Sequence, residues 1–126
     1  MKNLIINIKQ EITLGHFEEI IVSSLEGGSN YWYFINWEDI PKGNDPASMK
    51  IAKKLFEDPE FKLPVYDTEK PDELLGTVTQ QSMLEALELA HVQCSSHYYA
   101  LIDGTGDADT ADAIFQLATM KEIVFG

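Results

Sequence analysis

Two histidines and the single cysteine of the chain follow one another at three-residue steps, as His91, Cys94 and His97. Imidazole and thiolate groups are ordinary zinc ligands, and a cysteine beside a histidine is also the pattern of a nucleophilic pair. On one helix, however, positions 91 and 97 point about 120° apart, so both imidazoles cannot share an ion with the thiol without distortion. His91 and Cys94 also lie on an apolar stripe, where a thiol is usually inert. The pattern favours core packing.

Four aspartates gather around a glycine-containing turn near the end of the chain, at Asp103, Asp107, Asp109 and Asp112. Aligned on Asp103, a calcium loop of the EF-hand type needs a glycine where Ala108 stands and a bidentate glutamate where Ile114 stands. The pattern fails at both places. Two interpretations stay open: a looser magnesium or calcium site, which a small metal-dependent hydrolase would use together with a histidine, and simple capping of the helix that follows.

Two glycine-rich turns, Gly27–Gly28 and Gly104–Gly106, raise the question of phosphate binding. The first follows a helical pattern and so lies at the negative end of that helix, and the second stands among aspartates that would repel a phosphate. Neither has the spacing of a dinucleotide or Walker motif, and no Gly-x-Ser-x-Gly elbow is present. We therefore predict no catalytic residue, no metal ligand and no cofactor, and the sequence leans away from an enzyme.

Four consecutive aromatic residues occupy positions 31–34, and Trp37 follows them. Their β-propensity predicts a strand over residues 31–37, with the even-numbered rings toward the core and the odd-numbered rings on the opposite face. Exposed tyrosine and tryptophan are typical anchors of protein interfaces. Tyr31, Tyr33 and Trp37 are therefore the candidate interface, for a partner protein or a second copy of the chain. The alternative is that all of these rings are core.

Apolar residues recur at steps of three and four in three stretches, which predicts three main helices. The first begins after its N-cap, Thr13, and ends at Gly27, because glycine readily adopts the positive φ of a helix end. The second has Thr77 or Thr79 as N-cap and an inward stripe made of Leu84, Leu87, His91, Cys94 and Tyr98. The last covers residues 110–120, with an inward face made of Ile114, Leu117 and Ala118.

Other segments complete a small sheet and its connections. Alternation predicts a strand over residues 3–8, a hairpin of residues 61–66 and 74–79, and a short strand over residues 123–125. All five prolines lie in a loop-rich section, residues 38–73, in which a surface helix over residues 47–57 is expected to turn Met49, Ala52, Leu55 and Phe56 inward. We predict a single α+β domain over residues 1–126, with three main helices packed on a mostly antiparallel sheet.

The charge balance narrows the classes of partner. The chain has 21 acidic residues against 9 basic ones, a net charge of −12, and all the basic residues are lysines. The absence of arginine and the negative charge argue against direct nucleic-acid binding and against a phosphate clamp. The dispersed acids suit either a solubilising surface or a surface that imitates nucleic acid and inhibits a DNA-binding protein. The unpaired Cys94 and the polar residues that interrupt the apolar start predict a cytoplasmic protein with no membrane association.

Two segments resemble the two ends of a family of small phage- and prophage-encoded proteins of unassigned function, which also occur in bacterial hosts. The first is Glu-Gly-Gly-Ser-Asn-Tyr-Trp-Tyr, residues 26–33, and the second comprises residues 107–116 and 121–126. A glycine often precedes the family segment that matches Glu122-Ile-Val, where this chain has Lys121. The resemblance implies a genomic context, and it implies that the turn after the first helix packs against the last helix and the C-terminal strand.

These observations predict a non-enzymatic accessory protein of a phage or mobile element that acts by protein–protein binding, with another protein or a second copy of the chain as its partner. Two alternatives remain: a small metal-dependent hydrolase that uses the turn from Asp103 to Asp112, and an acidic mimic of nucleic acid.

Overall fold

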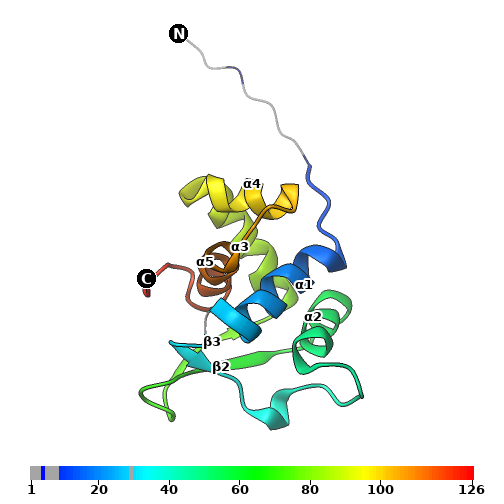
Figure 1. Cartoon of the computed structure of the whole chain (residues 1–126), viewed down its shortest axis with the longest axis vertical. Coiled ribbons are helices and arrows are strands. Elements are labelled where there is room, and N and C mark those ends of the chain that lie inside the picture. Colours follow the sequence, from blue (N-terminus) through cyan, green and yellow to red (C-terminus); the bar gives the residue numbers. More distant parts are fainter. Residues whose placement is uncertain (1–3, 5–8, 29) are drawn as a thin grey trace.

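A computed structural model describes residues 4, 9–28 and 30–126 of the chain. The strand expected over residues 3–8 lies outside these residues except for Leu4, which is exposed. The described residues form an α+β fold in which helices cover one side of a three-stranded antiparallel sheet (Figure 1), as the sequence predicts. The helices are α1 (Leu14–Ser23), α2 (Ala47–Glu57), α3 (Gln80–Gln93), α4 (Ser95–Asp103) and α5 (Ala108–Met120). The strands are β1 (Tyr33–Phe34), β2 (Leu63–Asp67) and β3 (Leu74–Val78).

The sheet has the order β1-β2-β3, and its inner face rests on the helices. Leu63 and Val65 alternate toward the helices and are fully buried, as is Val78 at the end of β3. The predicted hairpin is confirmed, with Leu63 paired to Val78 and a register shift after Val65. The predicted surface helix is also confirmed as α2, although Met49 is exposed and Ile51 takes its place among the buried side chains.

Helix α1 begins as expected but ends differently. Thr13 caps it: the Thr13 hydroxyl accepts the backbone N–H of His16, and the His16 ring accepts the backbone N–H of Thr13. At the other end Ser24 keeps helical backbone angles, and the chain widens into a π-type turn, η1 (Ser24–Gly28). Gly27 does not adopt the positive φ of a C-cap, so the predicted stop at Gly27 is wrong. The helix unwinds through a looser turn because Ser24 still bonds to the carbonyls of Ile20 and Ile21.

The helix predicted around His91 and Cys94 is divided in two. Thr79 caps α3, but Cys94 leaves helical geometry with φ −146° and ψ 64°, and α4 starts at Ser95. Ser95 and Ser96 follow Cys94 directly, and serine is a weak helix former that favours the start of a helix. The local sequence therefore favours a new helix at the position where the break occurs. Because the chain changes direction there, His91 does not continue the apolar stripe, and its side chain is exposed rather than buried.

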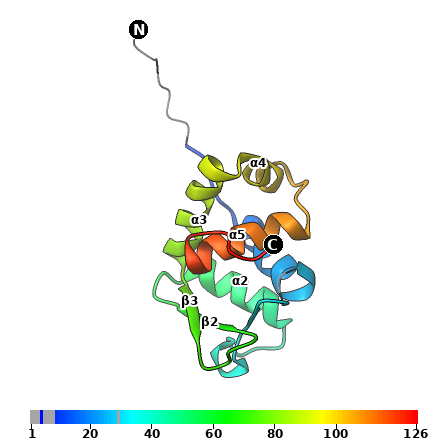
Figure 2. The same ribbon diagram turned by 90° about the vertical axis from the view of Figure 1, so that its left-hand side faces the viewer.

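Helix α5 lies at the centre of the helical layer, where it contacts α1, α3, α4, η1 and β3 (Figure 2). The predicted inward residues Ile114, Leu117 and Ala118 are buried, and so are most of the other side chains of α5. The residues after α5 form no strand, so the strand predicted over residues 123–125 is wrong. Among the helices that the structure describes, none has the length and apolar character needed to cross a membrane.

Candidate protein-binding surface

The aromatic run is fixed on α5 by a single carboxylate. The Trp32 indole N–H donates to Asp112 Oδ1 and the Tyr31 hydroxyl donates to Asp112 Oδ2, each at 2.8 Å. The Tyr31 side chain remains 51% exposed, so its ring lies at the surface while its hydroxyl is engaged. Partial burial, together with the hydrogen bond and the negative charge of Asp112, raises the pKa of Tyr31 to about 12.

The C-terminal segment closes over the same region. The ring of Phe125 stacks on Trp32 with centroids 5.3 Å apart, and the Gln116 side chain holds the segment. Gln116 Nε2 donates to the Phe125 carbonyl at 2.9 Å, and the N–H groups of Val124 and Phe125 donate to Gln116 Oε1. The turn after the first helix therefore packs on the last helix and the C-terminal segment, which is the packing expected for these segments, although Gln116 replaces strand pairing as the link.

Tyr33 is not part of any exposed surface. Its side chain is only 3% exposed, its ring packs on Phe115 with centroids 4.8 Å apart, and its hydroxyl lies 3.4 Å from Ser24 Oγ. Burial raises the pKa of Tyr33. The predicted placement of Tyr33 on an outward face is wrong, because the strand is limited to Tyr33–Phe34 and the preceding residues form a turn. Two-residue alternation therefore does not extend across the aromatic run.

Trp37, the third candidate interface residue, is exposed over 83% of its surface. It begins η2 (Trp37–Asp39), a short 3₁₀ turn. Two backbone hydrogen bonds close this turn, from Asp39 N–H to the Asn36 carbonyl at 3.0 Å and from Ile40 N–H to the Trp37 carbonyl at 3.1 Å. A large apolar ring is thus held out from the protein on an ordered backbone.

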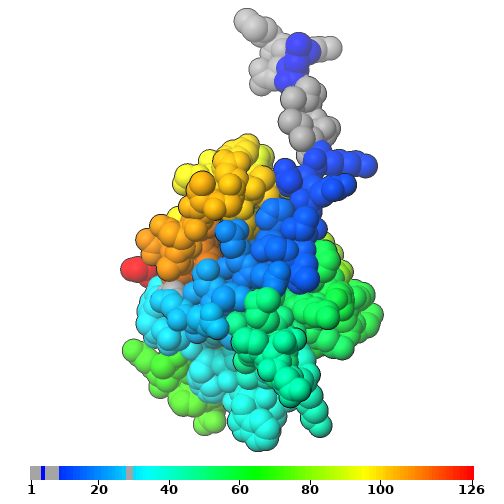
Figure 3. Space-filling view, turned by 45° about the vertical axis from the view of Figure 1, so that its right-hand side comes forward, coloured from blue at the N-terminus to red at the C-terminus, as the bar shows by residue number. Residues whose placement is uncertain are grey.

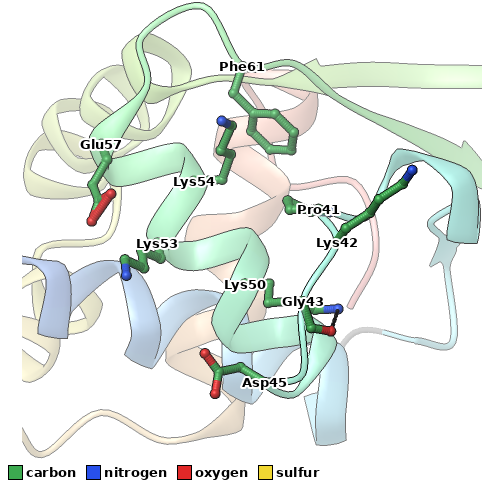
Figure 4. A pocket seen from close by; sticks show the side chains of 9 residues that line it. All are labelled: Pro41, Lys42, Gly43, Asp45, Lys50, Lys53, Lys54, Glu57 and Phe61. Carbon is green, nitrogen blue, oxygen red and sulfur yellow. Dashed lines mark hydrogen bonds between the residues drawn. The ribbon is translucent and has the colours of Figure 1, made fainter.

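A hollow of about 470 Å³ lies directly after this turn, between the following loop and α2. We call it the lysine hollow; it is lined by Pro41, Lys42, Gly43, Asp45, Lys50, Lys53, Lys54, Glu57 and Phe61 (Figure 4). Lys50 Nζ donates to the Gly43 carbonyl at 3.0 Å, and Lys54 pairs with Asp58 at 3.4 Å. Within the part of the chain that the structure describes, Lys42 and Lys53 form no ion pair. Seen from outside, η2, the loop and α2 form one continuous face below α1 (Figure 3).

Two of the four aspartates expected as a possible metal site, Asp107 and Asp112, have other partners. Asp107 caps α5, where its Oδ1 accepts the backbone N–H of Thr110 at 3.0 Å and the Thr110 hydroxyl at 3.2 Å. These hydrogen bonds hold the pKa of Asp107 below its usual range. Asp112 accepts from the two aromatic residues already described. Among the described residues, no three histidine, cysteine or acidic side chains are grouped so as to hold a metal ion.

The histidines and the cysteine lie in separate surroundings. His97 Nδ1 lies 3.1 Å from Thr110 Oγ1, whereas His91 Nε2 lies 3.2 Å from the Tyr99 hydroxyl. Cys94 is half-buried at the break between α3 and α4, and burial raises the pKa of its thiol. A raised thiol pKa lowers the thiolate fraction at neutral pH, which is the opposite of nucleophile activation.

The three predicted interface residues differ in exposure: Trp37 is highly exposed, Tyr31 is exposed but hydrogen-bonded through its hydroxyl, and Tyr33 is buried. The lysine hollow was not predicted, although α2 carries a readable signal: Lys50, Lys53 and Lys54 follow the three- and four-residue steps of one helix face. Comparisons with protein-family models, with curated proteins and with solved structures found no match. The structural part of the functional argument therefore depends on this surface.

Proposed function

We propose that this chain is a non-enzymatic accessory protein that acts by binding another protein, with Trp37 as the anchor of the interface. The observation that carries the proposal is the contrast between its two tryptophans. Trp32 is 2% exposed and hydrogen-bonded inside the fold, whereas Trp37 is 83% exposed. Tryptophan is among the residue types most enriched at the energetic centre of protein interfaces, since one ring buries a large area on contact.

The ordered backbone around Trp37 supports the same function. Its backbone lies in the hydrogen-bonded turn η2, so binding would order few additional backbone dihedrals, and an indole has only two side-chain torsions to fix. On the outer side of the adjoining strand pair, Phe34 stacks on Tyr66 with centroids 5.6 Å apart. A surface that is already ordered before contact needs little rearrangement on binding.

The genomic and cellular setting is part of the proposal. The likeness of the two terminal segments to a phage- and prophage-encoded family supports a role in a phage or mobile element. The single cysteine supports a cytoplasmic location. The hydrolase alternative is not carried further, because Asp107 and Asp112 already serve as helix cap and aromatic acceptor. The nucleic-acid mimic is not carried further either, because the surface that follows the Trp37 turn is lined by four lysines and only two acidic residues.

The proposal is tested by binding measurements on Trp37→Ala. Immobilised wild-type protein is used to capture partners from lysate of a phage-host bacterium, and sedimentation velocity measures self-association. We expect Trp37→Ala to weaken the complex roughly thirtyfold, about 2 kcal/mol, as for other interface anchors. Tyr99→Ala is the matched control, because Tyr99 is an exposed aromatic residue on α4, at the end of the molecule opposite η2 (Figure 1). A strict monomer whose captured proteins are the same for wild type and Trp37→Ala would contradict the proposal.

A further inference from the structure

We propose that the lysine hollow beside Trp37 binds an acidic segment of the partner protein. The inference rests on the proposed function, because it places the partner's carboxylates next to the Trp37 anchor. It adds the chemistry of the partner, which the exposed tryptophan alone does not specify.

The first observation is the distribution of charge along the chain. Residues 42–62 hold five of the nine lysines against four acidic residues, which gives this stretch a net charge of +1. The net charge of the whole chain is −12, so the remaining residues together carry −13. This stretch around α2 therefore repels a negatively charged partner less, on average, than the rest of the chain does, although Glu38 and Asp39 stand next to Trp37 in η2. Complementary charge steers association and disfavours partners of the wrong sign.

The second observation is how the lysines are arranged. Lys42 projects from the loop, and Lys53 and Lys54 project from α2, with Pro41 and Phe61 between the two sides (Figure 4). Their amines point in different directions rather than toward one point. A compact anion such as phosphate needs converging donors, whereas an extended chain meets spaced amines with successive carboxylates. The apolar surface of Pro41 and Phe61 suits the aliphatic parts of that chain.

The lysines are also available for exchange. The Lys54 to Asp58 pair is an exposed (i, i+4) contact at 3.4 Å, and such surface pairs contribute only about 0 to 1 kcal/mol. Lys42 and Lys53 have no ion pair within the described residues. An incoming carboxylate therefore displaces little existing structure.

A protein segment fits this surface better than a nucleic acid. The hollow includes Asp45 and Glu57, which would repel a continuous line of phosphates but still leave room for isolated carboxylates next to the lysines. The chain has no arginine, the residue best suited to phosphates and stacked bases. Pro41 follows η2 with only Ile40 between them, so the same bound segment reaches the Trp37 anchor.

The test uses a short fluorescein-labelled peptide of alternating glutamate and leucine as the probe, with binding followed by fluorescence anisotropy at low salt. We expect saturable binding that weakens as salt is added. The double variant Lys42→Glu/Lys53→Glu should weaken it about tenfold, as expected when two complementary charges are reversed. Lys70→Glu/Lys121→Glu is the matched control, because it makes the same charge change away from the hollow. Circular dichroism verifies that all variants fold.

Several outcomes would overturn the inference. No peptide binding at low salt, or equal weakening in the control variant, would show that the hollow has no specific role. Tighter binding of single-stranded oligothymidine than of the peptide would point to nucleic acid, and displacement of the peptide by stoichiometric inorganic phosphate would point to a compact anion site.

If a captured partner is lost with Trp37→Ala but kept with Lys42→Glu/Lys53→Glu, the inference fails and the proposed function stands. If Lys42→Glu/Lys53→Glu weakens peptide binding while Trp37→Ala alters neither capture nor self-association, the proposed function fails.

Discussion

The indole N–H of Trp32 donates a 2.8 Å hydrogen bond to Asp112 across eighty positions of the chain. The other oxygen of the same carboxylate accepts from Tyr31 at 2.8 Å, so one acidic side chain on α5 holds the turn that precedes β1. Because Trp32 is almost fully buried, its N–H has no alternative partner in water once this acceptor is removed. The two hydrogen bonds to Asp112 therefore position the segment that leads through β1 to Trp37.

Asp112→Ala should destabilise the fold by about 1 to 3 kcal/mol, the usual cost of leaving a buried donor unsatisfied. Asp112→Asn should cost less, because its amide keeps one oxygen for the indole N–H. Urea denaturation followed by tryptophan fluorescence measures both effects. Asp109→Ala is the control, since Asp109 is an exposed aspartate in the first turn of the same helix. Equal midpoints for the substitutions at 109 and 112 would show that the Asp112 contacts contribute nothing to stability.

Gly76→Ala should be strongly destabilising. A Cβ at this position in β3 would lie 1.9 Å from the backbone carbonyl oxygen of Thr119, so either the strand or α5 must shift. Overpacking of this kind typically costs about 1 to 3 kcal/mol, and a clash with backbone belongs at the upper end. Gly27→Ala is the control, because a Cβ there meets nothing within 4 Å and the backbone φ is not in the positive region. Thermal unfolding should separate the two variants clearly; similar melting temperatures would contradict the close approach of β3 and α5.

Much of the fold could be predicted because its signals are local. Thr13 is the predicted N-cap of α1, Thr79 is one of two candidates for α3, and Asp107 is one of the aspartates for which helix capping was an open interpretation. Each caps its helix in the structure. The hairpin of β2 and β3 follows from β-propensity on both sides of a polar loop. These features depend on residues a few positions apart, which a sequence displays directly.

The errors arise where tertiary contacts override a local pattern. The stripe through His91 and Cys94 has an unbroken helical period, yet the chain bends at Cys94 so that α4 packs against α5. Tyr33 has the alternation of an outward-facing strand residue, but the turn before it places both Trp32 and Tyr33 in the core. Gly27 has the residue type of a helix stop without the backbone angles of one.

The candidate site could be predicted only in part, because one of its features is local and the other depends on tertiary contacts. Trp37 was identified by residue type alone, and its exposure agrees with that choice. The lysine hollow depends on the contact between Lys50 and the Gly43 carbonyl, which brings the loop alongside α2. The helical spacing of the lysines was visible, but the opposite wall of the hollow belongs to a loop whose course no periodicity describes.

Alkaline pH should destabilise the protein through Tyr31 and Tyr33. Both phenols hold their protons more tightly in the folded state, and the pKa of Tyr31 rises to about 12 from an ordinary value near 10. Their stabilising contribution is therefore complete below pH about 10 and is lost as the pH rises toward the folded-state pKa values. Urea midpoints measured across this range should fall with pH, and Tyr31→Phe should fall less steeply than wild type. A midpoint that is constant or rises with pH would contradict this linkage.

Cys94 should react slowly with thiol reagents in the folded protein. Burial raises the pKa of its thiol, so the thiolate, which is the reactive form, is scarcer at neutral pH than for an exposed cysteine. We expect urea to accelerate the reaction with a chromogenic disulfide, and we expect the pH midpoint of the native rate to lie above about 8.5, the ordinary value for a cysteine. Cys94→Ser sets the background. In the structure His97 lies beside Thr110, which argues against a nucleophilic pair of Cys94 and His97. A native rate equal to the rate in urea, with a pH midpoint below the ordinary value, would identify an activated thiol and would favour that pair again.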